Sequence, residues 1–222
     1  MLISYRHRFL FVHIAKTGGT SIRRALRPYR WGWPYTPALA LCSLMSQMTQ
    51  PRHALGIKFP RHAKAIAAHE MLPREFYESL FKFTVVRNPW DLQVSSYHHL
   101  CREHPDVVRG LPHFASFLRH KLDAERGYDF LLDISKERQW RYLCDIDGNS
   151  IVDYVGRYER LGEDYQHICE RIGINPPPLP HERRSSERSD YREYYDDALA
   201  ELVAEHYADD IRRFGYRFDG PD

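Results

Sequence analysis

The amino-acid sequence predicts an α/β fold in which helices flank a central parallel sheet. Three observations support this prediction. An apolar run at residues 9–14 passes through a glycine turn into a helix-like segment, and a second at 81–86 passes directly into another. A third run, at 151–155, follows an Asp-Gly turn. Strands that alternate with helices are typical of a parallel sheet covered on both faces.

The remaining elements follow from periodicity and composition. We expect helices from about Ser21, over 62–80, over about 89–102 and over 113–122. A last helix is predicted near the C-terminus by one apolar face, which consists of Leu199, Leu202, Val203, Tyr207, Ile211 and Phe214. Residues 28–60 are rich in Pro, Trp and Gly and show no regular pattern, so we interpret them as a lid or substrate wall.

Length and composition predict a single domain over residues 1–222. The formal net charge is only +2, so no basic field indicates a nucleic-acid partner. The four cysteines include no CxxC pair and are interpreted as reduced. No signal peptide or membrane span is visible, and we expect a cytoplasmic protein. The sequence leaves the oligomeric state open.

The segment from Ala15 to Ser21 (Ala-Lys-Thr-Gly-Gly-Thr-Ser) joins the first predicted strand to the first predicted helix. Glycines allow the backbone to approach a ligand closely, and the N–H groups at a helix N-terminus attract anions. Lys16 adds a cation, and three hydroxyls add donors. This segment is interpreted as a phosphate or sulfate cradle; the alternative is a simple glycine turn. The Lys precedes the glycines, unlike the Lys of the nucleoside-triphosphate loop.

A second motif, Arg87-Asn88-Pro89-Trp90-Asp91, follows the strand predicted at 81–86. Pro89 suits the first turn of a helix. Arg87 at the strand end and Ser95 in that helix could together receive a phosphate dianion. The alternative reading pairs Arg87 with Asp91.

Together the two motifs resemble those of sulfotransferases that use 3′-phosphoadenosine 5′-phosphosulfate (PAPS), in particular short bacterial members of the carbohydrate-type branch. The resemblance extends through residues 152–161, through Leu179-Pro180-His181 and into the C-terminal tail, and so covers nearly the whole chain. It implies a three-layer, P-loop-like sulfotransferase fold. It also implies an enzyme that moves a sulfonate from PAPS to a hydroxyl or amine of a carbohydrate, glycolipid or similar acceptor, without a metal.

The resemblance assigns roles to individual residues. Lys16 would stabilise the leaving group, where charge develops as the bond breaks. The 5′-phosphosulfate would be held by Thr17, Gly18, Gly19, Thr20 and Ser21. Arg87 and Ser95 would hold the 3′-phosphate. A loop over the donor in relatives corresponds to residues 181–189, where Arg183 or Arg184 could clamp that phosphate; the alternative is a solvated basic loop.

An alcohol acceptor also requires a general base, which relatives supply as His or Glu between the two motifs. His62 is the first candidate, because Arg61-His62-Ala63-Lys64-Ala65 resembles a His-Ala-Thr-Ala sequence of short bacterial members, from which Lys64 departs. His69, beside Glu70, is the second. If residues 62–80 form one helix, the two histidines share a face.

Two other functions fit parts of the sequence. A P-loop phosphotransferase would need an acidic metal ligand at a strand end, for which Asp133 after Phe130-Leu131-Leu132 is a weak candidate. A non-catalytic protein that binds nucleotides or sulfated glycans would keep the cradle and lack the base. The acceptor itself is not encoded in any motif; residues 28–60 and 103–138 are the segments expected to select it.

Overall fold

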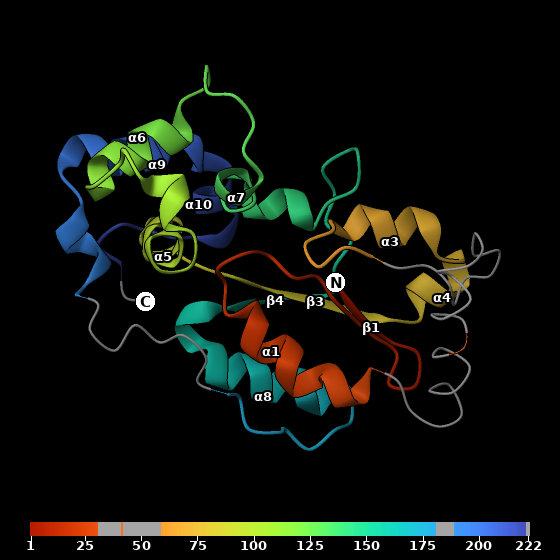
Figure 1. The fold of residues 1–222 in the computed structure, drawn as a ribbon. Helices are drawn as coiled ribbons and strands as arrows, with labels where there is room; N and C mark the ends of the chain where they lie inside the picture. The colour runs from red at the N-terminus through yellow and green to blue at the C-terminus, as the bar shows by residue number, and fades with distance from the viewer. Residues whose placement is uncertain (31–40, 42–58, 181–188, 221–222) are drawn as a thin grey trace.

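The computed structural model describes residues 1–30, 41, 59–180 and 189–220 (Figure 1). Its sheet has four strands in the order β1–β2–β3–β4, with bounds Leu2–Ser4, Phe9–Phe11, Phe81–Val86 and Tyr154–Arg157. β2, β3 and β4 are parallel, and β1 is antiparallel to β2. The α/β fold with helices around a central sheet is confirmed. The antiparallel edge strand was not predicted, because three residues are too few to show an alternating pattern.

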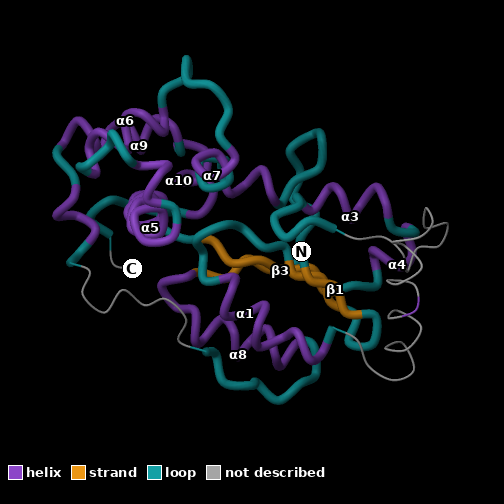
Figure 2. The backbone as a smooth tube through the Cα atoms, in the orientation of Figure 1, coloured by secondary structure: helices purple, strands orange, loops and turns teal. Residues whose placement is uncertain are grey.

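Two helices, α1 (Gly19–Leu26) and α8 (Leu161–Arg171), cover one face of the sheet (Figures 1 and 2). Successive side chains of a strand point to opposite faces, so Phe9 and Phe11 project together toward this layer. They pack in one buried cluster with Phe83 of β3, Ile22 of α1 and Ile168 of α8, among others. Burial of these aromatic and branched side chains is the main stabilising contribution of this layer.

The opposite face is covered by α3 (Ala65–Met71) and α4 (Arg74–Glu78), which pack on Ile3 and Leu10. The sequence predicted one helix over 62–80, which was wrong. Pro73 is the N-cap residue of α4, and Leu72 before it is extended at φ −92° and ψ 150°. A residue before proline is pushed out of the helical region, which explains the break.

The third group of helices gathers on the other side of the sheet from α1 and α8, near the ends of β3 and β4 (Figures 1 and 2). Its members are α5 (Pro89–Glu103), α6 (Phe114–Leu122), α7 (Phe130–Asp133), α9 (Asp197–His206) and α10 (Ala208–Phe214). They share the largest buried cluster, which includes Trp90, Phe117 and Val203. The apolar face predicted for one C-terminal helix is divided between α9 and α10, which meet at Tyr207.

Short 3₁₀ helices complete the described chain: η1 (Arg27–Tyr29), η3 (Pro105–Val108), η4 (Gln139–Tyr142), η5 (Tyr158–Arg160) and η6 (Tyr191–Tyr194). The strand predicted at 81–86 is confirmed with those bounds. The strand predicted at 9–14 ends at Phe11, and the one at 151–155 is displaced to 154–157. In the described part of the chain, no helix is both long and apolar enough to cross a membrane.

Parallel pairing of β2 with β3 has one consequence for function. Phe11 is opposite Phe83, and the N–H of Val12 donates to the carbonyl of Phe83 at 2.9 Å. Both strands therefore end at the same edge of the sheet. Ligands of open α/β sheets bind at the carboxyl ends of parallel strands. The two sequence motifs follow β2 and β3 and are brought together at this edge.

Candidate active site

The cradle (residues 15–21) is a backbone turn between β2 and α1. Lys16 has φ 67° and Gly18 has φ 77°, so two of its residues are left-handed. Gly18 is the N-cap of α1, and its carbonyl accepts the N–H of Ser21 at 3.0 Å. The first N–H groups of a helix have no partner within the helix, so those that follow Gly18 suit an anion. This is the geometry that the sequence predicted for the cradle.

Gly19 packs against His13 so closely that it admits no side chain. A Cβ placed on Gly19 would lie 2.2 Å from Cδ2 and 2.4 Å from Nε2 of the imidazole. His13 is buried, stacks on Phe11, and its Nδ1 has no hydrogen-bond partner among the described residues. Burial lowers the pKa of His13 well below its usual range, so the ring is neutral at physiological pH. The imidazole is thus a fixed wall behind the cradle.

The Thr17 hydroxyl has a different role from the one predicted. Its side chain is buried, and Oγ1 donates to the carbonyl of Ile14 at 3.1 Å. It therefore shapes the turn from inside and does not line the pocket. Lys16, Gly18, Gly19, Thr20 and Ser21 do line it.

Arg87 lies at the carboxyl end of β3 and connects the two motifs directly. Its Nη1 donates to the carbonyl of Lys16 at 3.0 Å, and its Nε donates to Oδ2 of Asp91 at 2.6 Å. The guanidinium is 3.9 Å from the centroid of the Tyr158 ring. The alternative reading, an Arg87–Asp91 ion pair, is thus present, and Arg87 lines the pocket at the same time. Asp91 lies in the first turn of α5, which begins at Pro89 and is capped by the Asn88 side chain. This places the Asp91 carboxylate beside Arg87 at the end of β3.

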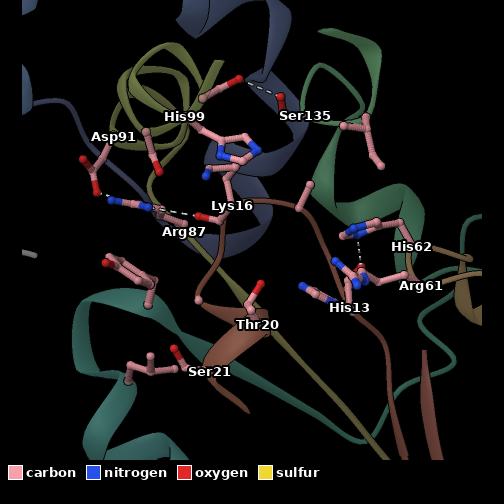
Figure 3. Close-up of a pocket in the computed structure, with 18 of the residues that line it drawn as sticks. His13, Lys16, Thr20, Ser21, Arg61, His62, Arg87, Asp91, His99 and Ser135 are labelled. Carbon is pink, nitrogen blue, oxygen red and sulfur yellow. Dashed lines mark hydrogen bonds and ion pairs between the residues drawn. The ribbon is translucent and has the colours of Figure 1, made fainter. Parts of the chain in front are cut away.

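One pocket of about 840 Å³ unites these groups (Figure 3). Its lining comes from the cradle, residues 61–62, α5, residues 130–135, residues 158–162 and residues 179–180. Ser95 on α5 is part of it, as predicted. Figure 3 shows the Lys16 side chain between Arg87 and His99, with His62 and Arg61 on the other side of the pocket. Three basic residues, Lys16, Arg61 and Arg87, line the pocket with two acidic ones, Asp91 and Glu159, and this excess of positive charge favours an anionic ligand.

His62 reaches the pocket from the loop before α3. Its Nδ1 lies 2.9 Å from the carbonyl oxygen of His13, and the two rings are 4.5 Å apart. Because a carbonyl only accepts, Nδ1 carries the hydrogen and Nε2 is the unprotonated atom. Burial, reinforced by the N-terminal amine, Arg61 and Arg23, lowers the pKa of His62 to about 4. The imidazole is therefore a proton acceptor of fixed tautomer.

The structure does not bring His69 to the pocket. It lies on α3 with its side chain exposed, 2.6 Å from a carboxylate oxygen of Glu70 and edge-on to the Tyr77 ring. The shared helix face expected for His62 and His69 is absent, because His62 precedes α3. His69 as a general base is the part of the predicted site that this geometry disfavours.

Comparison with known proteins now decides the family. A model described as "Sulfotransferase family" matches residues 1–217. The chain belongs to the sulfotransferase family. It is therefore a transferase enzyme. A crystal structure of a sulfotransferase from Alicyclobacillus acidocaldarius is similar, with 17% sequence identity and a TM-score of 0.48 over 95% of this chain and 96% of that one. No curated protein matches.

Several residues that line this pocket were not singled out from the sequence, among them His13 and Glu159. His13 was placed only inside the predicted strand, and its contact with Gly19 depends on the turn geometry. Glu159, on η5, lines the pocket while accepting the N–H of Asn88 at 2.6 Å and the hydroxyl of Tyr216 at 3.1 Å. Its position in the Tyr-Glu-Arg segment, which resembles family sequences, was the available signal.

Most of residues 28–60, the expected lid or substrate wall, lies outside the described residues. Arg183 and Arg184 lie outside the described residues. Asp133 belongs to α7, not to a strand end, and forms an ion pair with Arg126, so it does not fit the metal ligand of a P-loop phosphotransferase. Within the described ranges no group of three or more His, Cys, Asp or Glu side chains is arranged to hold a metal.

Proposed function

We propose that this sulfotransferase moves a sulfonate from PAPS to a hydroxyl or amine of a carbohydrate or similar acceptor. The observation that carries the proposal is the hydrogen bond between Arg87 and the Lys16 carbonyl, which ties the two expected donor-binding motifs into one wall of one pocket. PAPS carries a phosphosulfate and a 3′-phosphate on one ribose. A site for it needs two anion receptors at a fixed separation.

The residues divide the donor between them. The α1 N-terminus, with Gly18, Gly19, Thr20 and Ser21, would take oxygens of the 5′-phosphosulfate. Arg87 and Ser95 would take the 3′-phosphate. The Arg87–Asp91 pair supports this role, because the carboxylate fixes the guanidinium in place before the ligand arrives. Ordinary adenine nucleotides lack the 3′-phosphate and would lose these contacts.

The reaction needs a cation and a base on either side of the sulfur. The acceptor oxygen forms the new S–O bond as the bond from sulfur to the bridging phosphate oxygen breaks. Lys16 stabilises the charge that develops on that bridging oxygen. The acceptor proton passes to Nε2 of His62, whose tautomer is set by the His13 carbonyl. The leaving group is 3′-phosphoadenosine 5′-phosphate (PAP).

Donor binding would also make His62 a better base. Its pKa of about 4 reflects burial and neighbouring positive groups. A nearby anion favours the protonated form of an imidazole, so the negative charge of PAPS raises this pKa toward the usual value. The proton affinity of His62 is then greatest while the donor is bound. The carbohydrate-like acceptor and a cytoplasmic location, where PAPS is made, remain parts of the proposal.

Turnover of the donor tests this function. The purified protein is incubated with ³⁵S-labelled PAPS in EDTA, with and without simple sugars and alcohols. Transfer of the label to the acceptor and release of unlabelled PAP are both measured. We expect metal-independent PAP release that an alcohol accelerates, and a loss of roughly 100-fold or more in Lys16→Met. PAP binding without any turnover would favour the non-catalytic binding protein. Turnover of ATP with Mg²⁺ would favour a phosphotransferase.

A further inference from the structure

Lys121 of α6 is a fully buried lysine whose described partners include no carboxylate. Its Nζ contacts Oε1 of Gln93 at 2.8 Å, Oγ of Ser96 at 3.0 Å, and both Oγ and the carbonyl oxygen of Ser135 at 2.9 and 3.2 Å. Side chains of lysine are almost never fully buried unless paired. The surroundings of Lys121 must therefore explain how an amine without a described carboxylate partner is fully buried.

Two of those partners open into the active-site pocket. Ser96 and Ser135 (the serine pair) both line it, whereas Lys121 does not. Their hydroxyls are 2.8 Å apart, and Figure 3 shows Ser135 near His99, on the side of the pocket toward which Lys16 points. The amine therefore contacts the pocket lining through these two hydroxyls.

The charge state of Lys121 follows from its environment. Burial lowers its pKa well below the usual range, and the Lys16 ammonium adds to that effect. Asp133 opposes it, but its carboxylate is engaged by Arg126, and Arg126 and Lys136 also disfavour a further positive charge. These groups together favour the neutral amine.

The numbers of hydrogens and lone pairs in this network determine which atoms of the serine pair are left to face the pocket. A neutral amine donates two hydrogens and accepts one. Gln93 Oε1 and the Ser135 carbonyl can only accept, so they take both hydrogens. The amide orientation of Gln93 is fixed independently. The Tyr207 hydroxyl donates its hydrogen to the Lys136 carbonyl at 2.9 Å, so it accepts from Nε2 of Gln93 at 2.9 Å. The nitrogen lone pair of Lys121 accepts a hydrogen from one serine, and that serine accepts the hydrogen of the other.

Both serine hydrogens are consumed inside the network, whichever hydroxyl donates to the amine. The serine pair therefore presents only oxygen lone pairs to the pocket, and these accept hydrogen bonds and repel anions. An ammonium in the same place would donate its third hydrogen to one of the serine oxygens, and one serine hydrogen would then be left to point into the pocket, toward an anion. The arrangement therefore discriminates between a neutral hydroxyl and a carboxylate or sulfate.

We infer that the serine pair, held by Lys121, is a subsite for a second hydroxyl of a polyhydroxylated, uncharged acceptor. This inference rests on the proposed function and narrows its acceptor class. The neighbouring walls, Leu100, Leu131 and Ile134, are apolar and suit the carbon face of a polyol or sugar ring. Lys121 is a positioning residue, because it touches the serines and not the acceptor.

Three small acceptors of similar size test the subsite. PAP release from PAPS is measured with glycerol, propan-1-ol and 3-hydroxypropanoate, each above the reaction with water. We expect the wild type to prefer glycerol by about 10-fold, the value of one hydrogen bond of roughly 1–1.5 kcal/mol. Lys121→Met, Ser96→Ala and Ser135→Ala should each reduce this preference several-fold while the affinity for PAP stays within about twofold.

A matched control is Ser116→Ala, on the same helix as Lys121, whose hydroxyl bonds the His113 carbonyl outside the pocket. It should retain the preference, and the two pocket serine variants keep the test valid if Lys121→Met does not fold. Equal rates with all three alcohols, a preference for 3-hydroxypropanoate, or a glycerol preference that survives both pocket serine variants would overturn the subsite. If PAP does not bind the wild type, the proposed function itself fails, and the subsite with it.

Discussion

The cradle and the serine pair occupy the same pocket but are built in opposite ways. The cradle is seven consecutive residues whose shape comes from backbone dihedral angles, with left-handed Lys16 and Gly18. The serine pair depends on α5, α6 and the segment after α7, and Lys121 is separated by 28, 25 and 14 residues from Gln93, Ser96 and Ser135. One is a local turn, the other a product of tertiary packing.

In the proposed function, the local turn would bind the donor and the tertiary network would bind the acceptor. The phosphates of a donor are the same for every acceptor, so backbone N–H groups of a turn and one arginine suffice to bind them. An acceptor is distinguished by its own hydroxyls, which requires side chains with a defined hydrogen-bond direction. The serine pair is tested by the acceptor series above; the four predictions below test the cradle, Arg87 and His62.

The largest effect is expected for Lys16→Met, which retains the length of the stem without its charge. Turnover of PAPS should fall roughly 100- to 1000-fold, because Lys16 acts mainly on charge that develops in the transition state. PAP affinity, measured by calorimetry, should fall by much less. Equal losses in turnover and affinity would show that Lys16 only binds the donor.

Gly19→Ala should disrupt the cradle through His13. The new methyl group would lie 2.2 Å from the imidazole, which is buried and cannot move away cheaply. We expect a loss of roughly 1–3 kcal/mol in unfolding free energy and weaker PAP binding. The control is Gly110→Ala, where a Cβ meets nothing within 4 Å and the change should be within about 0.5 kcal/mol. Equal stability of the two variants would contradict the close packing.

Arg87→Gln tests which phosphate Arg87 contacts. Affinity for PAP should fall about 10- to 100-fold, whereas affinity for adenosine 5′-phosphosulfate, which lacks the 3′-phosphate, should change only a few-fold. Loss of the buried contacts to Asp91 and Lys16 will also reduce stability, but that cost is common to both ligands. A parallel loss for the two nucleotides would assign Arg87 to structure alone.

The smallest effect concerns the pH dependence of stability. The folded-state pKa of His62 is about 4, below its unfolded value of about 6.5, so the unfolded chain binds the extra proton between these values. Stability should therefore fall as pH decreases from 6.5 to 4. His62→Gln should reduce this loss of unfolding free energy, summed from pH 6.5 to pH 4, by on the order of 1 kcal/mol. Urea unfolding at each pH measures it. Asp210, whose raised pKa of about 6 lies in the same window, titrates in both proteins, so its contribution cancels. Identical pH dependence of the two proteins would refute the depressed pKa of His62.

The sequence predicted the parts of the site that are encoded locally. The strand at 81–86, the cradle and the approach of Arg87 and Ser95 to it follow from short patterns and parallel strand pairing. Side-chain directions were less accessible. Thr17 was expected to face the ligand, and instead its hydroxyl satisfies the Ile14 carbonyl inside the turn. His62 and His69 do not share a helix face, because α3 begins at Ala65, after His62.

Lys121 shows where sequence reasoning ends. Within Phe-Leu-Arg-His-Lys-Leu, it reads as one of several exposed cations on an amphipathic helix. Its burial depends on Gln93, Ser96 and Ser135 arriving from distant segments, and no periodicity encodes that meeting. Buried polar networks of this type become visible only when the tertiary structure places all their members together.

The central claim is that this pocket binds a nucleotide through its 3′-phosphate without a metal. Calorimetric titration of the protein with PAP, and in parallel with ATP plus Mg²⁺, tests it most directly. We predict tight binding of PAP that EDTA does not change, and weak or no binding of ATP with Mg²⁺. Binding of ATP only, and only with Mg²⁺, would contradict the assignment of the donor site.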